Sequence, residues 1–368
     1  MEIGMVQIMA SFGLQGINDQ QVYDEEVRQA VLADELDFDH VWVVEHHFED
    51  YSFCPDNFVY LAHIAARTKR IRLATGAVIL PWNIQPLRVA EKAALLDTLS
   101  GGRLILGLGR GLSRREFGQF GVSMDESRDR FDEMAPMILD ALETGVMEEH
   151  HGRHFDQPRA PLRPKPFRSF RGRTAQVAMS SDSVEDAGRL GVQMMSFLYK
   201  PDEVHKNEFK TYRAAFQRAH GTEPPKAPLL AMMTICDSDA ARAKENAEQY
   251  CATYFHSVMH HYELMGEHYA KTKGYADYGV GAEAMRAAGL DDMVRAYVDQ
   301  QLWGTPDQIL RKLEAKRQSI GDIGCLCAFR FGANPYEVSE RSMRLFASEV
   351  LPVARAWTAP AEHLQAAE

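Results

Sequence analysis

The sequence predicts a (β/α)8 barrel, in which eight parallel strands alternate with helices. Short apolar runs of strand length recur along the chain, and longer stretches with helical periodicity separate them. Alternation of this kind favours a closed parallel sheet that is covered by helices. The 368 residues suit one such barrel, and neither a linker nor a short-period repeat divides them. We therefore expect residues 1–368 to form a single domain.

The first half of the chain is expected to supply four strand-and-helix pairs. Each strand is a run of mainly apolar residues, as suits a strand buried on both faces. The expected strands are residues 3–9, 41–44, 71–80 and 104–109. The expected helices are residues 20–36, 57–66, 87–99 and 127–142.

The second half repeats the pattern after a proline-rich stretch, residues 148–173, which we expect to be an irregular surface excursion. The strands are expected at 176–179, 192–197, 229–236 and 322–331, and the helices at 183–190, 203–220, from about 238, after Thr305-Pro306 and at 335–350. Between about 256 and 290 glycines are scattered among polar and aromatic residues, which is typical of a mobile active-site lid. This stretch is called the lid segment below.

Composition limits the classes of binding partner and the cellular compartment that we expect. The net charge of −11 argues against nucleic acid, whose phosphates attract basic surfaces. No apolar run approaches the roughly 20 residues that span a bilayer, and no signal-peptide pattern opens the chain. The five cysteines form no Cys-x-x-Cys motif, and Cys325 and Cys327 lie in an apolar run as buried thiols. A cytoplasmic protein with no membrane partner is expected.

The most informative motif is the strand Val41–Val44 with the cluster that follows it. Glu45, His46 and His47 come directly after the strand, where a barrel places its chemistry. A carboxylate beside two imidazoles provides proton transfer near neutral pH. A pair of solvated or structural histidines is the alternative that the motif alone leaves open.

Two further motifs are suited to binding a phosphate. Residues 107–111 (Gly-Leu-Gly-Arg-Gly) let a ligand approach the backbone and add the fixed charge of Arg110, although a dinucleotide fingerprint is absent. Residues 179–183 (Met-Ser-Ser-Asp-Ser) offer hydroxyls and N–H groups at a helix start. A tight turn and plain N-capping explain the two motifs equally well. The small residues that begin Thr75–Pro81 leave room for a flat ring.

Other histidines give no metal site. His150, His151 and His154 lie in the proline-rich excursion and are expected to be solvated. His256 and His260 share one face of an expected helix, but no carboxylate stands at a recognisable metal-ligand spacing. No metal is therefore predicted.

Taken together, the motifs resemble those of the bacterial luciferase-like flavin-dependent monooxygenases, and the chain is similar to the luciferase alpha subunit over nearly its whole length. Several separate segments carry the likeness in the right order. They are residues 38–48, 78–81, 95–104, 109–112, 120–128, 271–275 and 304–307.

The resemblance implies a luciferase-like barrel that uses reduced FMN supplied by a separate NAD(P)H:flavin reductase. In that family O₂ adds to the flavin, and the resulting peroxyflavin oxygenates a small organic substrate. Glu91 matches an acidic residue of a dimerisation helix, so a homodimer is expected. The lid segment matches the family's mobile active-site loop.

The resemblance also assigns roles to single residues. His46 matches the catalytic histidine, with Glu45 and His47 beside it. The residues that match the cofactor site are Gly76, Ala77, Gly109, Arg110, Met179, Ser180 and Ser183. Within this set Arg110, Ser180 and Ser183 match the phosphate clamp, and the Gly76–Ala77 bond matches a cis peptide beneath the flavin ring.

Three departures bear on the substrate. Gly109 stands where the alpha subunit has a reactive cysteine, and this difference predicts a roomier position. In addition, Met179 replaces a glutamate, and Trp82 alters the loop after Pro81. They argue against a long-chain aldehyde substrate and light emission. The alternatives are a deazaflavin-dependent hydride transfer on the same fold, a non-catalytic flavin-binding protein and a metallohydrolase.

Overall fold

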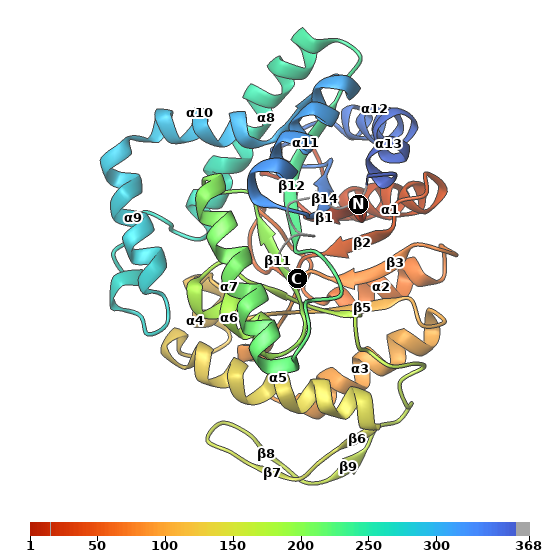
Figure 1. Ribbon diagram of the computed structural model, residues 1–368, viewed down its shortest axis with the longest axis vertical. Helices are drawn as coiled ribbons and strands as arrows, with labels where there is room; N and C mark the ends of the chain where they lie inside the picture. The colour runs from red at the N-terminus through yellow and green to blue at the C-terminus, as the bar shows by residue number, and fades with distance from the viewer. Residues whose placement is uncertain (15, 358–368) are drawn as a thin grey trace.

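Eight parallel strands close into a barrel in the computed structural model, which describes residues 1–14 and 16–357 (Figure 1). The order of the strands along the chain is also their order around the barrel, and pairing of the last strand with the first closes the ring. The strands are β1 (Ile3–Gln7), β2 (His40–Val43), β3 (Arg72–Thr75), β5 (Leu104–Gly109), β10 (Thr174–Val177), β11 (Gln193–Phe197), β12 (Leu229–Cys236) and β14 (Gly324–Ala328). The predicted (β/α)8 fold is confirmed.

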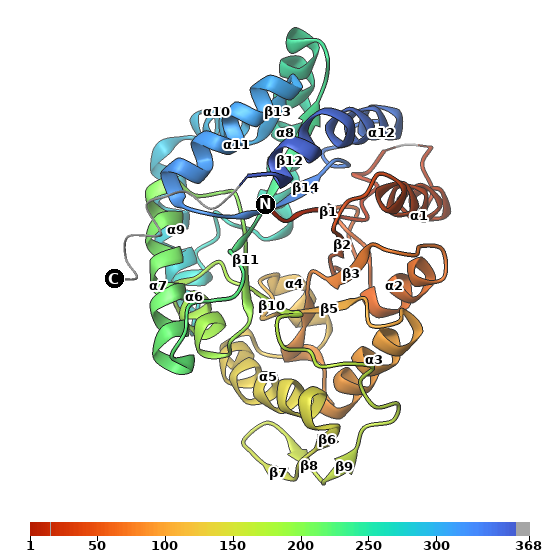
Figure 2. The same ribbon diagram turned by 45° about the vertical axis from the view of Figure 1, so that its right-hand side comes forward.

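Helices form a ring around the strands, as the turned view shows (Figure 2). Local signals begin several of them: Asn18 with Gln21 and Thr305 with Gln308 are capping boxes, and Asp56 caps the second helix. The helices of the ring are α1 (Asp19–Glu35), α2 (Asn57–Ala65), α3 (Pro86–Leu99), α5 (Ser127–Thr144), α6 (Ser181–Arg189), α7 (Asp202–His220), α11 (Pro306–Ile320) and α12 (Tyr336–Leu345).

Alternate residues of each strand face the helices and the barrel interior. In β2, Val41 and Val43 pack in the layer between strands and helices, whereas Trp42 belongs to the inner cluster. Trp42 is fully buried, and Gly107 leaves space for its ring, since a Cβ there would lie 3.0 Å from the indole and 2.0 Å from the Thr75 carbonyl oxygen. The inner layer is thus filled by side chains, and ligands are confined to the barrel's ends.

Several element boundaries differ from the sequence-based expectation. The strand expected at 71–80 is interrupted after Thr75, where Gly76–Ala77 is a cis peptide bond, and resumes as β4 (Val78–Ile79) before a 3₁₀ turn. The short elements α4 (Arg114–Gln119) and β13 (Leu302–Gly304) were not predicted. The last helix continues beyond α12 through a π-helical turn (Phe346–Val350) into α13 (Leu351–Arg355).

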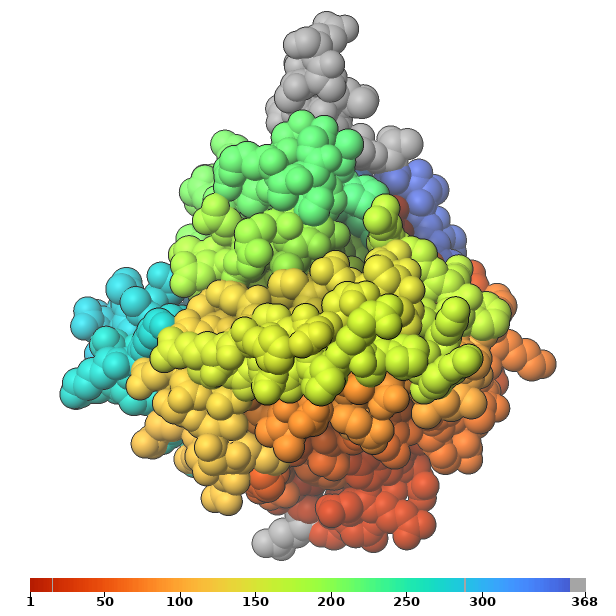
Figure 3. Space-filling view, turned by 90° about the horizontal axis from the view of Figure 1, so that it is seen from below, coloured from red at the N-terminus to blue at the C-terminus, as the bar shows by residue number. Residues whose placement is uncertain are grey.

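The proline-rich excursion is more regular than predicted. It contains two antiparallel pairs, β6 (Val146–Met147) with β9 (Ala160–Pro161) and β7 (His150–His151) with β8 (Asp156–Gln157). Together they project beside α5 in Figure 1 and lie across the face shown in Figure 3. The Glu133 carboxylate of α5 holds the turn by accepting N–H bonds from His154 and Phe155.

The lid segment also holds more helix than its irregular pattern indicates. The long helix α8 (Ala240–His261) runs into it, and a 3₁₀ turn (Tyr269–Lys271), α9 (Ala276–Ala288) and α10 (Leu290–Gln300) follow. Its mobility stays a prediction. Among the described residues, no helix is both long and apolar enough to cross a membrane.

A buried ion pair joins α3 to the barrel, and its loss is expected to be costly. The Arg173 guanidinium donates to both Asp97 oxygens, at 2.6 and 3.1 Å, and also to the Leu104 carbonyl. Asp97→Ala leaves a buried cation without its carboxylate, so we expect a loss of about 3–5 kcal/mol in urea unfolding. Glu185→Ala, which breaks the exposed pair with Arg218, is the control and should cost less than about 1 kcal/mol. Equal losses would contradict the assignment.

Candidate functional site

The chemistry-bearing residues collect at the carboxyl end of the barrel. His46 follows β2, Ala77 follows β3, Arg110 follows β5 and Ser180 follows β10. Since all four strands are parallel, their carboxyl ends form one rim. The structure thus brings the predicted histidine and phosphate motifs to the same end of the molecule.

His46 is held between a carboxylate and a phenol. Its Nε2 lies 3.0 Å from the Tyr262 hydroxyl, and its Nδ1 lies 3.1 Å from Glu116 Oε1. Burial, together with the nearby Glu116 charge, raises the pKa of Tyr262 well above its usual value, so the phenol stays protonated and donates to Nε2. The Nδ1–H of His46 then donates to Glu116. This network fixes both the tautomer and the orientation of the ring.

Glu116 is the buried anion at the centre of the site. It lies on α4, is 2% exposed and also accepts the backbone N–H of His47 at 2.9 Å. Burial by itself raises the pKa of this carboxyl, but His46, His261 and the His47 N–H outweigh burial and lower it. The carboxylate is therefore ionised at neutral pH and holds the His46–His47 turn.

A second buried imidazole, His261 at the end of α8, completes the cluster. Its Nδ1 lies 2.7 Å from Glu49 Oε2, its ring stacks on Tyr51 at 4.4 Å, and its Nε2 lies 3.9 Å from Glu116 Oε1. Burial and the neighbouring His46 lower the pKa of His261 to about 4, against the opposing effect of Glu116 and Glu49. At neutral pH this ring is uncharged.

The Glu45 side chain turns away from His46. Its two oxygens accept hydrogen bonds from the Ile79 N–H at 3.2 Å and the Trp82 indole N–H at 2.8 Å. His47 packs edge-on against Phe120, with its Nε2 3.6 Å from Glu45 Oε1. These contacts hold the Glu45 and His47 side chains in place, and their direct part in proton transfer stays a prediction.

The predicted phosphate residues lie close together around the start of α6. The hydroxyls of Ser180 and Ser183 are 3.0 Å apart, and Arg128 donates to Ser183 at 3.0 Å. Met179 contributes its backbone oxygen to Lys200 at 2.7 Å, while its sulfur faces β11. Hydroxyls, N–H groups and cations therefore surround one helix start, a combination suited to an anion.

Residues of the lid segment occupy this anion site. The Asp277 carboxylate of α9 accepts hydrogen bonds from the Ser181 N–H at 2.8 Å and hydroxyl at 2.5 Å. Those bonds, with the charges of Lys200 and Arg110, lower the pKa of Asp277 despite partial burial. Arg110 itself donates to the Gly274 carbonyl at 2.6 Å and stacks on the Tyr275 ring at 4.1 Å. A protein carboxylate thus stands where an anionic ligand is expected.

The bond between Gly76 and Ala77, directly after β3, is a cis peptide bond, as the resemblance implied. Asn57 Nδ2 donates to the Ala77 carbonyl at 3.0 Å. The prediction that Gly109 is a roomy position is wrong, because a Cβ there would lie 2.8 Å from Ile79 Cδ1 and 3.1 Å from Ala77 Cβ. A side chain at 109 would therefore have to displace the end of the Ile79 side chain in β4.

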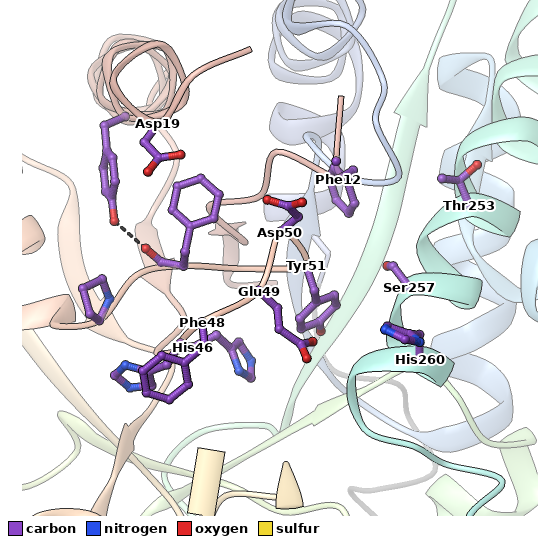
Figure 4. Close-up of a pocket in the computed structure, with 15 residues that line it drawn as sticks. Phe12, Asp19, His46, Phe48, Glu49, Asp50, Tyr51, Thr253, Ser257 and His260 are labelled. Carbon is purple, nitrogen blue, oxygen red and sulfur yellow. Dashed lines mark hydrogen bonds between the residues drawn. The ribbon is translucent and has the colours of Figure 1, made fainter. Parts of the chain in front are cut away.

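An open cleft of about 860 Å³ lies beside His46 (Figure 4). Thr253, Ser257 and His260 on one face of α8 point across it to the loop that carries Phe48 and Glu49. The aromatic side chain of Phe12 also lines this cleft. Trp82 and Phe117 instead pack together at 5.1 Å, and Trp303 stacks under Lys312.

Comparison with known proteins agrees with the geometry. Residues 1–322 match the family model described as luciferase-like monooxygenase. The chain belongs to the luciferase-like monooxygenase family.

Relatives within the luciferase-like monooxygenase family cover most of the chain. The alkanal monooxygenase alpha chain of Photobacterium leiognathi is 26% identical over 350 residues, which are 94% of this chain and 97% of the relative. The oxygenase component of the flavin-dependent trigonelline monooxygenase of Acinetobacter baylyi is 29% identical over 60% of this chain and 61% of its own. The crystal structure of monooxygenase RslO1 from Streptomyces bottropensis has a TM-score of 0.79 at 31% identity, covering 96% of this chain and all of that one.

More distant luciferase-like structures share the fold alone. They include the FMN complex of the oxygenating constituent of 3,6-diketocamphane monooxygenase from Pseudomonas putida, at 20% identity, and an F420-dependent secondary alcohol dehydrogenase, at 17% identity. Their TM-scores are 0.75 and 0.71. The fold therefore accommodates FMN in one of these proteins and the deazaflavin F420 in the other.

Sequence reasoning missed Glu116, His261, Tyr262 and Asp277. Glu116 lies on a six-residue helix without a clear periodic pattern, and the other three lie in or beside the lid segment. The sequence indicated His256 and His260 as a histidine pair, but the His260 side chain lines the open cleft. The adjacent residue His261 lies in the cluster instead.

The two N–H bonds to Glu45 make this position sensitive to amide substitution. In Glu45→Gln one acceptor oxygen becomes an NH₂ group that faces a buried N–H donor, so we expect a loss of about 1–3 kcal/mol in urea unfolding. Glu185→Gln on the exposed face of α6 is the matched control and should change stability by less than about 0.5 kcal/mol. A stability of Glu45→Gln equal to that of the control would show that these bonds contribute nothing.

Proposed function

We propose that this protein is the oxygenase component of a two-component, FMNH₂-dependent monooxygenase that acts on a small organic substrate. The observation that carries the proposal is the meeting of an ordered His46 network and an anion site at one rim of a luciferase-like barrel. The relative from Acinetobacter baylyi, itself the oxygenase component of a flavin-dependent monooxygenase, supports it.

The donor set fits a flavin mononucleotide. Arg110, Ser180 and Ser183 would hold its phosphate, and the Asp277 carboxylate already demonstrates that the start of α6 accepts an anion. Gly76, Ala77 and Gly109 would lie against the ring, with Met179 at the edge of the clamp. When bound, reduced FMN would supply the electrons with which O₂ is activated.

His46 would handle the proton of the reaction. Its Nδ1–H is shared with ionised Glu116, and its Nε2 accepts from Tyr262, so the ring can take up a proton at Nε2 while Glu116 stabilises the resulting cation. Glu45 and His47 would hold the turn in register. The Tyr51 and Tyr262 rings pack edge-on against the His46 imidazole and shield part of it from water.

The partners follow from the same proposal. An NAD(P)H:flavin reductase would donate FMNH₂, and the cleft beside His46 would admit the substrate. Large apolar side chains are exposed on α2, α3 and the loop before α3, and they support a homodimer through this face. They are Val59, Ile84, Leu95 and Leu99. All five cysteines are buried free thiols, in keeping with a reducing cytoplasm.

The decisive test mixes protein that carries anaerobically reduced FMN with oxygenated buffer and follows flavin absorbance. Because FMN held at this rim would be shielded from bulk water, we expect reoxidation in separable phases, the last slower than that of free FMNH₂. Reoxidation of demonstrably bound FMN at the free rate would refute the proposal. Anaerobic turnover with a reduced deazaflavin would instead establish hydride transfer.

Removal of the His46 imidazole should separate flavin binding from oxygenation. In His46→Ala we expect FMN to bind with unchanged affinity while product formed per FMNH₂ oxidised falls at least about tenfold. His260→Ala, on the far wall of the cleft, is the control for a general effect of losing a nearby imidazole. Full coupled turnover by His46→Ala would exclude the proposed role.

The lid segment should compete with the cofactor for the phosphate site. Asp277→Asn removes the charge that occupies the start of α6, so we expect FMN to bind about three- to tenfold more tightly in a fluorescence titration. Glu283→Gln, an exposed residue of the same helix, should leave the Kd unchanged. Weaker FMN binding by Asp277→Asn would mean that Asp277 helps to hold the flavin.

A further inference from the structure

Two buried side chains and one partly buried side chain converge at the rim in an arrangement to which the proposed oxygenase function assigns no ligand. One nitrogen each of His46 and His261 and one oxygen of Glu116 lie within 4.8 Å of one another. Glu116 and His261 are 2% and 1% exposed. The three come from the β2 loop, α4 and α8, so only the tertiary fold brings them together.

One ring nitrogen of His261 faces a carboxylate oxygen without a hydrogen bond between them. Its Nδ1–H donates to Glu49 at 2.7 Å, which leaves a lone pair on Nε2. That lone pair faces Glu116 Oε1 at 3.9 Å, and Nε2 has no hydrogen-bond partner among the residues that the structure describes. Two electron-rich atoms buried face to face repel each other unless a positive charge lies between them.

We propose that His46, Glu116 and His261 form a binding site for a divalent cation of the Zn²⁺ type. Two imidazole nitrogens and one carboxylate are a ligand set that zinc favours, with one position open. Bond lengths of about 2.0–2.2 Å place tetrahedral ligands about 3.3 Å apart. The separations of Glu116 Oε1 from His46 Nδ1 and His261 Nε2, 3.1 and 3.9 Å, bracket that value.

Each ligand already has the supporting hydrogen bond that metal ligands need. Glu49 orients His261, the His47 N–H holds Glu116, and Tyr262 lies at the second nitrogen of His46. Binding through His46 Nδ1 would move its proton to Nε2, which would then donate to the Tyr262 oxygen.

An ion can reach the site from solvent. His46 lines the 860 Å³ cleft, and His261 and Glu49 line a neighbouring hollow of about 500 Å³. The cations around that hollow are neutralised, Arg115 by Glu49 and Arg114 by Glu263. If the proposed oxygenase function holds, a bound ion would block proton transfer at His46 and inhibit the enzyme, but binding itself does not rest on that function.

The test titrates chelator-treated, dialysed protein with Zn²⁺ by calorimetry. We expect about one Zn²⁺ per chain and at least about tenfold weaker binding in His261→Ala. His260→Ala is the matched control, since it removes the neighbouring imidazole that lines the cleft, and it should bind as the parent does. Absence of stoichiometric binding, unchanged binding in His261→Ala, or equal loss in both variants would overturn the proposal.

A second variant protects the test against misfolding. If His261→Ala does not fold, Glu49→Gln removes the supporting carboxylate and keeps all three ligands, and we expect roughly tenfold weaker binding. The visible spectrum of bound Co²⁺ provides a readout that is independent of both variants. A spectrum of octahedral, all-oxygen coordination, or unchanged Zn²⁺ affinity in Glu49→Gln, would overturn the proposal.

Discussion

Closure of the parallel sheet is the constraint on which the rest of the structure depends. The pairings of β10 with β5 and of β14 with β1 complete the ring, and no strand edge is left between them. Residues 46, 110 and 180 are far apart along the chain, and each follows a strand of this ring. Closure therefore converts three unrelated loops into one rim. Trp42 is fully buried in the barrel interior, and Gly107 leaves space for its ring. The rim, and not the barrel centre, is therefore open to ligands.

At that rim a single buried carboxylate organises the chemistry. Glu116 binds the His46 ring and the His47 backbone, and its charge acts on His261 and Tyr262 as well. An ionised group at 2% exposure is stable only because these donors surround it. Burial and the Glu116 charge together keep Tyr262 protonated, whereas burial and the neighbouring His46 keep His261 uncharged against the opposing effect of that charge. One buried anion thus faces a neutral phenol and a neutral imidazole, and both the proposed proton transfer and the proposed cation site use this arrangement.

In the lid segment, the protein's own groups occupy an anion site. Asp277, the Gly274 carbonyl and the Tyr275 ring satisfy the start of α6 and the Arg110 guanidinium. Without these contacts, the cations and helix N–H groups at this anion site would have to be solvated instead. The contacts that stabilise this state must therefore be exchanged for contacts to any anionic ligand, so that ligand affinity and lid position are linked.

The sequence by itself determined the barrel and the family, and it located the Glu45-His46-His47 cluster and the two motifs for which phosphate binding stays a prediction. The alternation of strands and helices, the helix caps and the contiguous motifs each depend on residues that are near one another in the sequence. They can therefore be recognised without the structure. The split of the strand at 71–80 and the short α4 were missed because two to six residues carry too little periodic signal. The partnerships of Glu116, His261 and Asp277 were decided only by the tertiary structure. They join residues 46, 116 and 261, or 181 and 277, through side-chain contacts across the rim, and no spacing along the chain encodes a contact that the closure of the barrel creates.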